Sequence, residues 1–409
     1  MENIISDKNT SHPAFYQRNE AIDILRALTV LLMIFVNDFW SVKGVPPWMQ
    51  HAERGVDFLG LADVVYPVFL FVVGMSIPFA IENRIRKGLP DVSTVLHIFS
   101  RTFALLIMGA FTEQSLARLS PDIAFKMPVF KMLMVAGFFM IWNIYPKTDK
   151  PIRHLYTALQ IIGVLLLIYL AYTFRTRDGG YFRGSYGILG SIGWAYMFCA
   201  FVYLFVRSNI TKILLFWLGL FIYCMVRSKE FIPKEPNILN DLMGIVRIGS
   251  TTVLTMGGVL FSLMIVKFSH LKTRKKVIYW VSLVAVVTVA AFISHQFWII
   301  SKLSATPPWV LYSSAITIAT YGLLHWIVSK GGAKWFNIIK AGGTATLSCY
   351  VMPYFLQSIF YQYIPQYLHV KLPAWMQVDV YGLIKCFIWA LLCILFTALL
   401  ERGKIKLKI

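Results

Sequence analysis

Polar side chains lie at both ends of the first long apolar segment of this chain. Asp23 and Arg26 lie near its start, and Asn37 and Asp38 close it. On a helix, the eleven residues from Arg26 to Asn37 would span roughly 16 Å, so the two ends would lie near opposite faces of a bilayer. Such groups are costly in hydrocarbon and indicate a functional site, although a helix-entry ion pair and a helix-end amide are the simpler interpretations.

A histidine follows this segment in a short loop, and an acid lies near the start of the next apolar segment. His51 lies between Pro47 and Gly60, and Asp63 falls about one turn inside the second segment. Histidine exchanges a proton near neutral pH, and a neighbouring carboxylate can hold its tautomer. The pair therefore predicts proton-transfer chemistry. His295, near the end of a later apolar segment, is the alternative histidine for this role.

Two arginines within apolar segments also need an anionic partner. Arg101 and Arg247 would each be a cation inside the membrane. A guanidinium in that position either pairs with an acid, such as Glu113, or binds an anionic ligand. The sequence leaves both alternatives open.

Several common motifs of soluble enzymes do not occur in the sequence. It has no P-loop, dinucleotide fingerprint, HExxH or GxSxG. All five cysteines lie in apolar segments without CxxC or other metal-ligand spacing, so we expect small core residues and no metal. A primary pump or a hydrolase of soluble type is not expected.

The apolar content predicts an integral membrane protein. Of 409 residues, 58% are hydrophobic and 14% charged, which is more apolar surface than one soluble core could bury. We expect an all-α polytopic helix bundle with about 10–12 transmembrane helices. The expected spans are 21–41, 58–81, 95–112, 127–145, 155–173, 187–206, 210–226, 244–266, 277–300, 309–328, 342–364 and 380–400.

The distribution of basic residues predicts the topology. The net charge is +20, but the lysines and arginines fall in short segments between spans, which favours membrane topology over nucleic-acid binding. Most of them lie on the side of the N-terminus, so we expect both termini to face the cytoplasm. The expected organisation is a cytoplasmic tail at 1–20 with no cleavable leader, one transmembrane domain at 21–400 and a basic tail at 401–409.

The stretch from Asn19 to Ala80 resembles a known enzyme family. Its runs AIDILRALTVLLMIFVN, QHAERG and LADVVYPVFLFVVGMSI are similar to the catalytic region of heparan-alpha-glucosaminide N-acetyltransferases and their bacterial relatives, which belong to a wider transmembrane acyltransferase superfamily. The later runs ISKLSATPPWVLYSSAITIATYGLLHWIV and AGGTATLSCY resemble that family more loosely. The resemblance implies that His51 is the catalytic residue and that Asn37 and Asp63 act with it. Asp38 and His295 are further candidates on the acceptor side.

The resemblance also implies a reaction across the bilayer. Cytoplasmic acetyl-CoA would donate its acetyl group to a sugar or glycan on the other face, with His51 as general base or as acetyl carrier. Asn37 would stabilise the oxyanion, and Asp63 would orient His51 or bind the acceptor. A homodimer among membrane lipids is expected, in a bacterial inner membrane. The residues expected to hold CoA at the inner face are Asp23, Arg26, Arg84, Arg86, Lys87 and Arg101.

Two other functional classes remain open. A carrier for a lipid-linked sugar or an anionic solute would use Asp63, Arg101 and Arg247 as ligands for its substrate or coupling ion. The two halves of the sequence lack the matched Gly/Pro breaks of many such carriers, which argues against this class. A membrane scaffold would leave the polar residues without a role.

Overall fold

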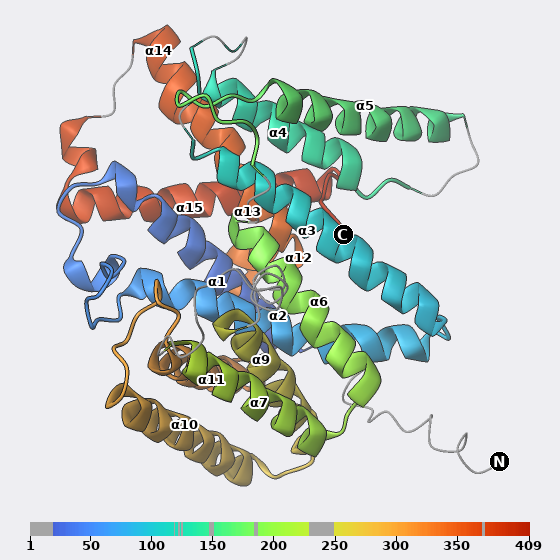
Figure 1. Ribbon diagram of the computed structural model, residues 1–409, viewed down its shortest axis with the longest axis vertical. Coiled ribbons are helices and arrows are strands. Elements are labelled where there is room, and N and C mark those ends of the chain that lie inside the picture. Colours follow the sequence, from blue (N-terminus) through green and yellow to red (C-terminus); the bar gives the residue numbers. More distant parts are fainter. Residues whose placement is uncertain are drawn as a thin grey trace. The chain divides into compact units, whose positions relative to one another are not determined.

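The computed structural model describes residues 19–117, 119–121, 123, 126–146, 151–183, 187–228, 249–369 and 373–409. In this part of the chain every regular element is a helix, and β pairing is limited to isolated bridges (Figure 1). Nine of these helices are long and apolar enough to cross a membrane. The expectation of a polytopic helical membrane protein is therefore confirmed. The nine are α2 (Leu61–Arg86), α3 (Asp91–Gln114), α5 (Ile152–Thr173), α6 (Gly187–Val206), α7 (Ile210–Ser228), α9 (Ser250–Lys267), α10 (Thr273–His295), α11 (Pro307–Ser329) and α15 (Asp379–Arg402).

The remaining three expected spans also fall on helix, but each departs from a simple apolar span. Helix α1 (Glu20–Asn37) has charged residues in its first two turns, and α4 (Met127–Trp142) has only 16 residues. The last is interrupted: α13 (Thr346–Gln357) continues through a π-helical segment (Ser358–Tyr363) into α14 (Ile364–Leu368). Such π segments often accompany functional sites.

The chain divides into two compact units, each assembled from distant segments. The first contains the described residues of Met1–Leu25, His51–Thr102 and Ile192–Ala333. In it α2 packs against α9 and α11, α9 also contacts α7, and α10 pairs with α11 (Figure 1). Helices α2 and α9 are the most buried of these, whereas α7 and α10 expose most of their apolar residues, as expected for helices that face lipid.

The contact between α2 and α9 depends on two glycines. A Cβ added at Gly74 would lie 1.8 Å from the backbone oxygen of Thr255, and one added at Gly258 would lie 2.0 Å from that of Phe71. The two backbones therefore touch directly, as small residues permit in membrane helix pairs. This contact fixes α2, whose first turn carries Asp63.

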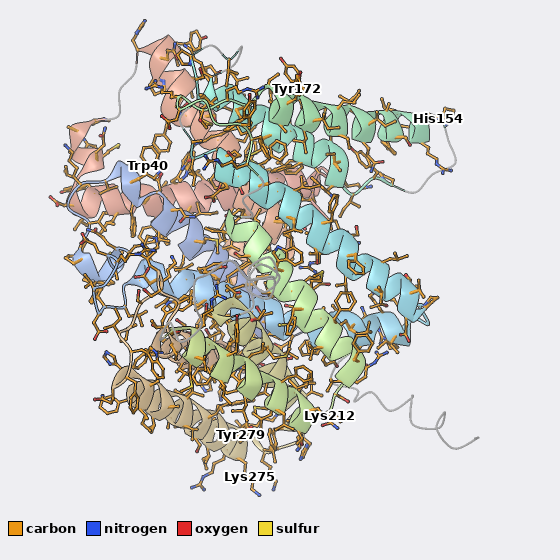
Figure 2. The ribbon with its side chains drawn as sticks, viewed as in Figure 1. Trp40, His154, Tyr172, Lys212, Lys275 and Tyr279 are labelled. Atoms are coloured by element: carbon orange, nitrogen blue, oxygen red, sulfur yellow. The ribbon has the colours of Figure 1, made fainter. Side chains whose placement is uncertain are left out.

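The second unit contains Arg26–Gln50, Phe103–Ser191 and Lys334–Ile409. Its α4 and α5 pack through Gly137 and Gly163, while α13 contacts both α4 and α15. Helix α5 is largely exposed from His154 to Tyr172 (Figure 2). Short helices complete the connections: α12 (Lys340–Thr344) and the 3-10 turns Phe39–Ser41, Pro47–Met49, Gly332–Ile339 and Ala374–Gln377.

The five cysteines occupy the positions expected of core residues. Each is buried and free of a disulfide. Cys199 and Cys224 belong to the first unit, and Cys349, Cys386 and Cys393 to the second. The cysteines are buried as expected because they lie in apolar spans, where a thiol packs as a small hydrophobic group.

We expect Gly258→Ala to destabilise the protein, because the new methyl group must displace the backbone of α2. Overpacking of this kind costs about 1–3 kcal/mol or more, which would lower the melting temperature in detergent by several degrees. Gly322→Ala in α11 is the matched control, since an added Cβ there meets nothing within 4 Å. Equal melting temperatures for the two variants would show that the close contact is not structurally important.

Candidate functional site

His51 and Asp63 form a hydrogen-bonded pair at the start of α2. The His51 Nδ1 atom lies 2.7 Å from Asp63 Oδ1, and the backbone N–H of Ala52 donates to Asp63 Oδ2 at 2.8 Å. The Asp63 side chain is 2% exposed, whereas that of His51 is 51% exposed. The N-terminal end of α2 also favours a carboxylate in its first turn. A buried acid therefore holds both the loop and the ring of an accessible histidine.

This geometry determines which ring nitrogen is available for chemistry. An ionised carboxylate only accepts hydrogen bonds, so we assign the proton of neutral His51 to Nδ1. The other nitrogen, Nε2, then carries a free lone pair. Among the described residues nothing forms a hydrogen bond with Nε2. The pair can thus accept a proton, or attack an electrophile, at Nε2.

Lys302, which the sequence analysis did not single out, completes this cluster from the loop between α10 and α11. Its Nζ lies 3.3 Å from His51 Nδ1, 3.9 Å from Asp63 Oδ1 and 3.5 Å from the backbone oxygen of Ala62. Burial lowers the pKa of the Lys302 ammonium, and attraction to Asp63 offsets part of that effect. A cation here balances the charge of Asp63. No spacing in the sequence links residue 302 to residues 51 and 63.

A buried tryptophan supports the same turn of α2. Trp309, at the start of α11, is 2% exposed and donates its indole N–H to the backbone oxygen of Asp63 at 3.0 Å. This bond ties the carboxylate-bearing turn to a second helix. The PPW run that contains Trp309 belongs to the segment with the looser family resemblance, so its sequence carried a weak signal.

His295, the alternative histidine, pairs with a different acid. Its Nε2 lies 2.8 Å from Asp57 Oδ2, while Asp57 Oδ1 accepts the N–H of Ile300 at 2.8 Å. The Phe58 N–H donates in turn to the Ile300 oxygen. The Ile300 N–H, together with His295, lowers the pKa of Asp57. His295 therefore connects the loop that bears His51 to the loop that bears Lys302, and its Nε2 is already bonded.

Asn37 and Asp38 belong to the second unit and have different environments there. Asn37 ends α1 and lines a cavity of about 530 Å³. Asp38 is fully buried, and its carboxylate accepts from Tyr361 Oη at 3.2 Å and Gln357 Nε2 at 3.5 Å. Lys385 Nζ lies 3.7 Å from the same group. Asp38 is thus the centre of a satisfied polar network, while Asn37 presents its amide to a cavity.

The arginines expected to bind CoA at the end of α2 have local partners. Arg84 donates to the Thr94 hydroxyl at 3.3 Å and to the oxygens of Ser93 at 3.0 and 3.1 Å, which braces the corner between α2 and α3. Arg86 donates to Asn83 at 3.1 Å, and Lys87 is exposed just beyond the helix. These contacts are those of a helix corner.

The other expected CoA ligands each have contacts or surroundings of their own. Arg26 donates to the backbone oxygen of Gly343 at 3.2 Å in the second unit, whereas Asp23 belongs to the first. The Arg101 guanidinium lies 4.6 Å from the centre of the Tyr196 ring. The ion pair expected between Asp23 and Arg26 stays a prediction. Arg247 lies outside the described residues.

No metal centre is found in the described part of the chain. There, no group of three or more His, Cys, Asp or Glu side chains could hold an ion. The histidine clusters described above each combine one imidazole with one carboxylate.

Comparisons with known proteins place part of this chain in a family. A family model described as a domain of unknown function, DUF5009, matches residues 18–244, more than half of the chain. Heparan-alpha-glucosaminide N-acetyltransferase from Mus musculus is 28% identical over 92 residues, and that from Homo sapiens is 29% identical over 96 residues. Each match covers 22% of this chain and 13% of the relative.

We expect Asp57→Asn to lower the melting temperature at pH 7, because a charged carboxylate bonds Ile300 and His295 more strongly than an amide does. The folded-state pKa of Asp57 is depressed, so this stabilisation is complete above the ordinary value of about 3.9 and is lost as the pH falls through the lower folded value. Melting curves of both proteins from pH 7 to pH 3 should therefore converge. A difference that stays constant over this range would contradict the assignment.

Proposed function

The chain belongs to the DUF5009 family, whose description assigns no activity, so we propose a function from the His51 site. The protein is a membrane acyltransferase that moves an acetyl group from acetyl-CoA to a sugar or glycan. The observation that carries the proposal is the His51–Asp63 pair, which leaves Nε2 free. The partial similarity to two N-acetyltransferases supports the reaction class. The expected topology would put this site on the extracytoplasmic side of a bacterial inner membrane, with both termini in the cytoplasm.

In the proposed mechanism His51 acts as general base. Nε2 takes the proton from the acceptor N–H or O–H as the acceptor atom bonds to the thioester carbonyl carbon. The C–S bond then breaks, and the CoA thiolate receives the proton from the imidazolium. Asp63 stabilises the imidazolium through Nδ1–H, as a buried carboxylate does in other His–Asp pairs. Alternatively, Nε2 itself takes the acetyl group and passes it to the acceptor, with the same overall balance.

Asn37 lines a cavity of the second unit that could bind a sugar. The cavity is lined by amides, hydroxyls and aromatic rings together with aliphatic side chains. Amides and hydroxyls both donate and accept hydrogen bonds, which matches the hydroxyl groups of a sugar. Asp38 has no such role in the proposal, because its carboxylate is already satisfied.

We expect His51→Ala to reduce acetyl transfer by roughly 10²–10⁴-fold, the usual contribution of a positioned general base. Acetyl-CoA should still raise the melting temperature of the variant, since a ligand that binds the folded state stabilises it. His154→Ala is the control, because it removes an exposed histidine of α5 that lies outside this cluster, and it should retain activity.

The same experiment separates the alternatives. Full activity in His51→Ala, with loss in His295→Ala, would transfer the role to His295. No thermal shift by acetyl-CoA in the wild type would contradict the acyltransferase proposal. Labelled acetyl-CoA without acceptor should leave label on the wild type, and none on His51→Ala, only if His51 carries the acetyl group.

We expect Lys302→Gln to lower acetyl transfer by about tenfold. Lys302 lies 3.9 Å from Asp63 and 3.3 Å from His51 Nδ1, so its removal takes away the cation that balances the buried carboxylate behind His51. Lys302→Arg retains the charge and should keep most of the activity, measured as the rate of acetyl transfer at pH 7. Full activity in Lys302→Gln would contradict a role for this cation in the site.

A further inference from the structure

The cavity beside Asn37 contains a lysine that no part of the proposed reaction uses. Lys131 lies near the N-terminal end of α4 and lines this cavity of about 530 Å³. Its neighbours in the lining include the amides of Gln357 and Gln362 and the phenol of Tyr354. Trp40, which is 69% exposed, also contributes to the lining and follows the end of α1 (Figure 2).

Lys131 lacks the anionic partner that a lysine in this position needs. Among the described residues no carboxylate lies within ion-pair distance of it, and it is partly buried. Lys385 of the same unit, by contrast, lies 3.7 Å from Asp38. A partly buried cation without a partner is costly and points to a ligand anion.

The helix that carries Lys131 reinforces the positive potential. Lys131 is the fifth residue of α4, and the N-terminal end of a helix carries a positive partial charge. A lysine is therefore unfavourable here for the stability of the helix, and an anion is favourable. Two independent features thus make this cavity attractive to a negative group.

We propose that the cavity around Lys131 binds a sugar that carries an anionic group, with Lys131 holding the anion and the surrounding amides holding the hydroxyls. The inference goes beyond the proposed function, because the whole cavity belongs to the second unit, whereas His51 belongs to the first. A uronate carboxylate and a sugar phosphate would satisfy the same chemistry. Lys131 thus selects anionic sugars over uncharged ones, and its partly buried charge lowers the stability of the folded protein.

The test uses the full chain in lipid nanodiscs and three probes, namely glucuronate, glucose 1-phosphate and uncharged methyl glucoside. By calorimetry at low salt the wild type should bind at least one anionic sugar about tenfold or more tightly than methyl glucoside, as expected for a partly buried charge pair. Which anion binds better identifies the source of the charge. Lys131→Gln should lose the preference and Lys131→Arg should keep it.

Lys126→Gln is the matched control, since Lys126 precedes the same helix and does not line the cavity. It should keep the preference. Without ligand, Lys131→Gln should melt at a higher temperature than the wild type, because an unpartnered cation has been removed, whereas loss of a structural lysine would lower it. A wild type without preference, a preference unchanged in Lys131→Gln, or equal loss in Lys126→Gln would each overturn the proposal.

The outcomes also separate this inference from the proposed function. Charge-dependent sugar binding in a protein that transfers no acetyl group would sustain the cavity and refute the acyltransferase. Acetyl transfer by a protein that binds the three sugars with equal affinity would sustain the enzyme and refute the cavity. Displacement of the probes by phosphatidylglycerol, at equal affinity in wild type and Lys131→Gln, would assign the binding to lipid contact and overturn the inference.

Discussion

The cost of placing a charge in or near hydrocarbon governs how this protein arranges its polar residues. Asp63 is almost completely buried, and it is compensated by a histidine ring, a backbone N–H and a nearby lysine. Asp38 is buried as deeply and is compensated by a phenol, an amide and another lysine. The two carboxylates therefore act differently. Asp63 orients the accessible ring of His51, whereas the partners of Asp38 lie within the second unit.

The same constraint distinguishes the two histidines. Both His51 and His295 bond a carboxylate, but they do so through different ring nitrogens. His51 bonds through Nδ1, which leaves Nε2 open, while His295 uses Nε2 to join two loops. The chemistry of a histidine depends on which ring nitrogen is free, so two histidines that each pair with an aspartate can differ in reactivity. His295 nevertheless helps to position the His51 loop. It bonds Asp57, and the hydrogen bonds of Asp57 connect the His51 loop to the loop that carries Lys302.

The helix arrangement serves this site through a few close contacts. The backbones of α2 and α9 touch at Gly74 and Gly258, and Trp309 of α11 bonds the first turn of α2. Together these contacts fix the turn that carries Asp63. The family to which the chain belongs is described without an activity, and the enzymes it partly resembles share only a small part of their length with it. The geometry of His51 is therefore the main support for a chemical role.

The sequence by itself determined the fold class, because an apolar run of bilayer length can satisfy its backbone hydrogen bonds within the bilayer only as a helix. It also predicted that Asp63 could orient the ring of His51, and the two side chains are hydrogen-bonded. Tertiary structure decided the partners. Lys302 reaches His51 across 251 residues, and no periodicity encodes that approach. The sequence predicts the arginines at the end of α2 as CoA ligands, and the tertiary structure adds that Arg84 is hydrogen-bonded to the start of α3. Helix periodicity is local and can be read along the chain, whereas the pairing of charges depends on which helices and loops pack together.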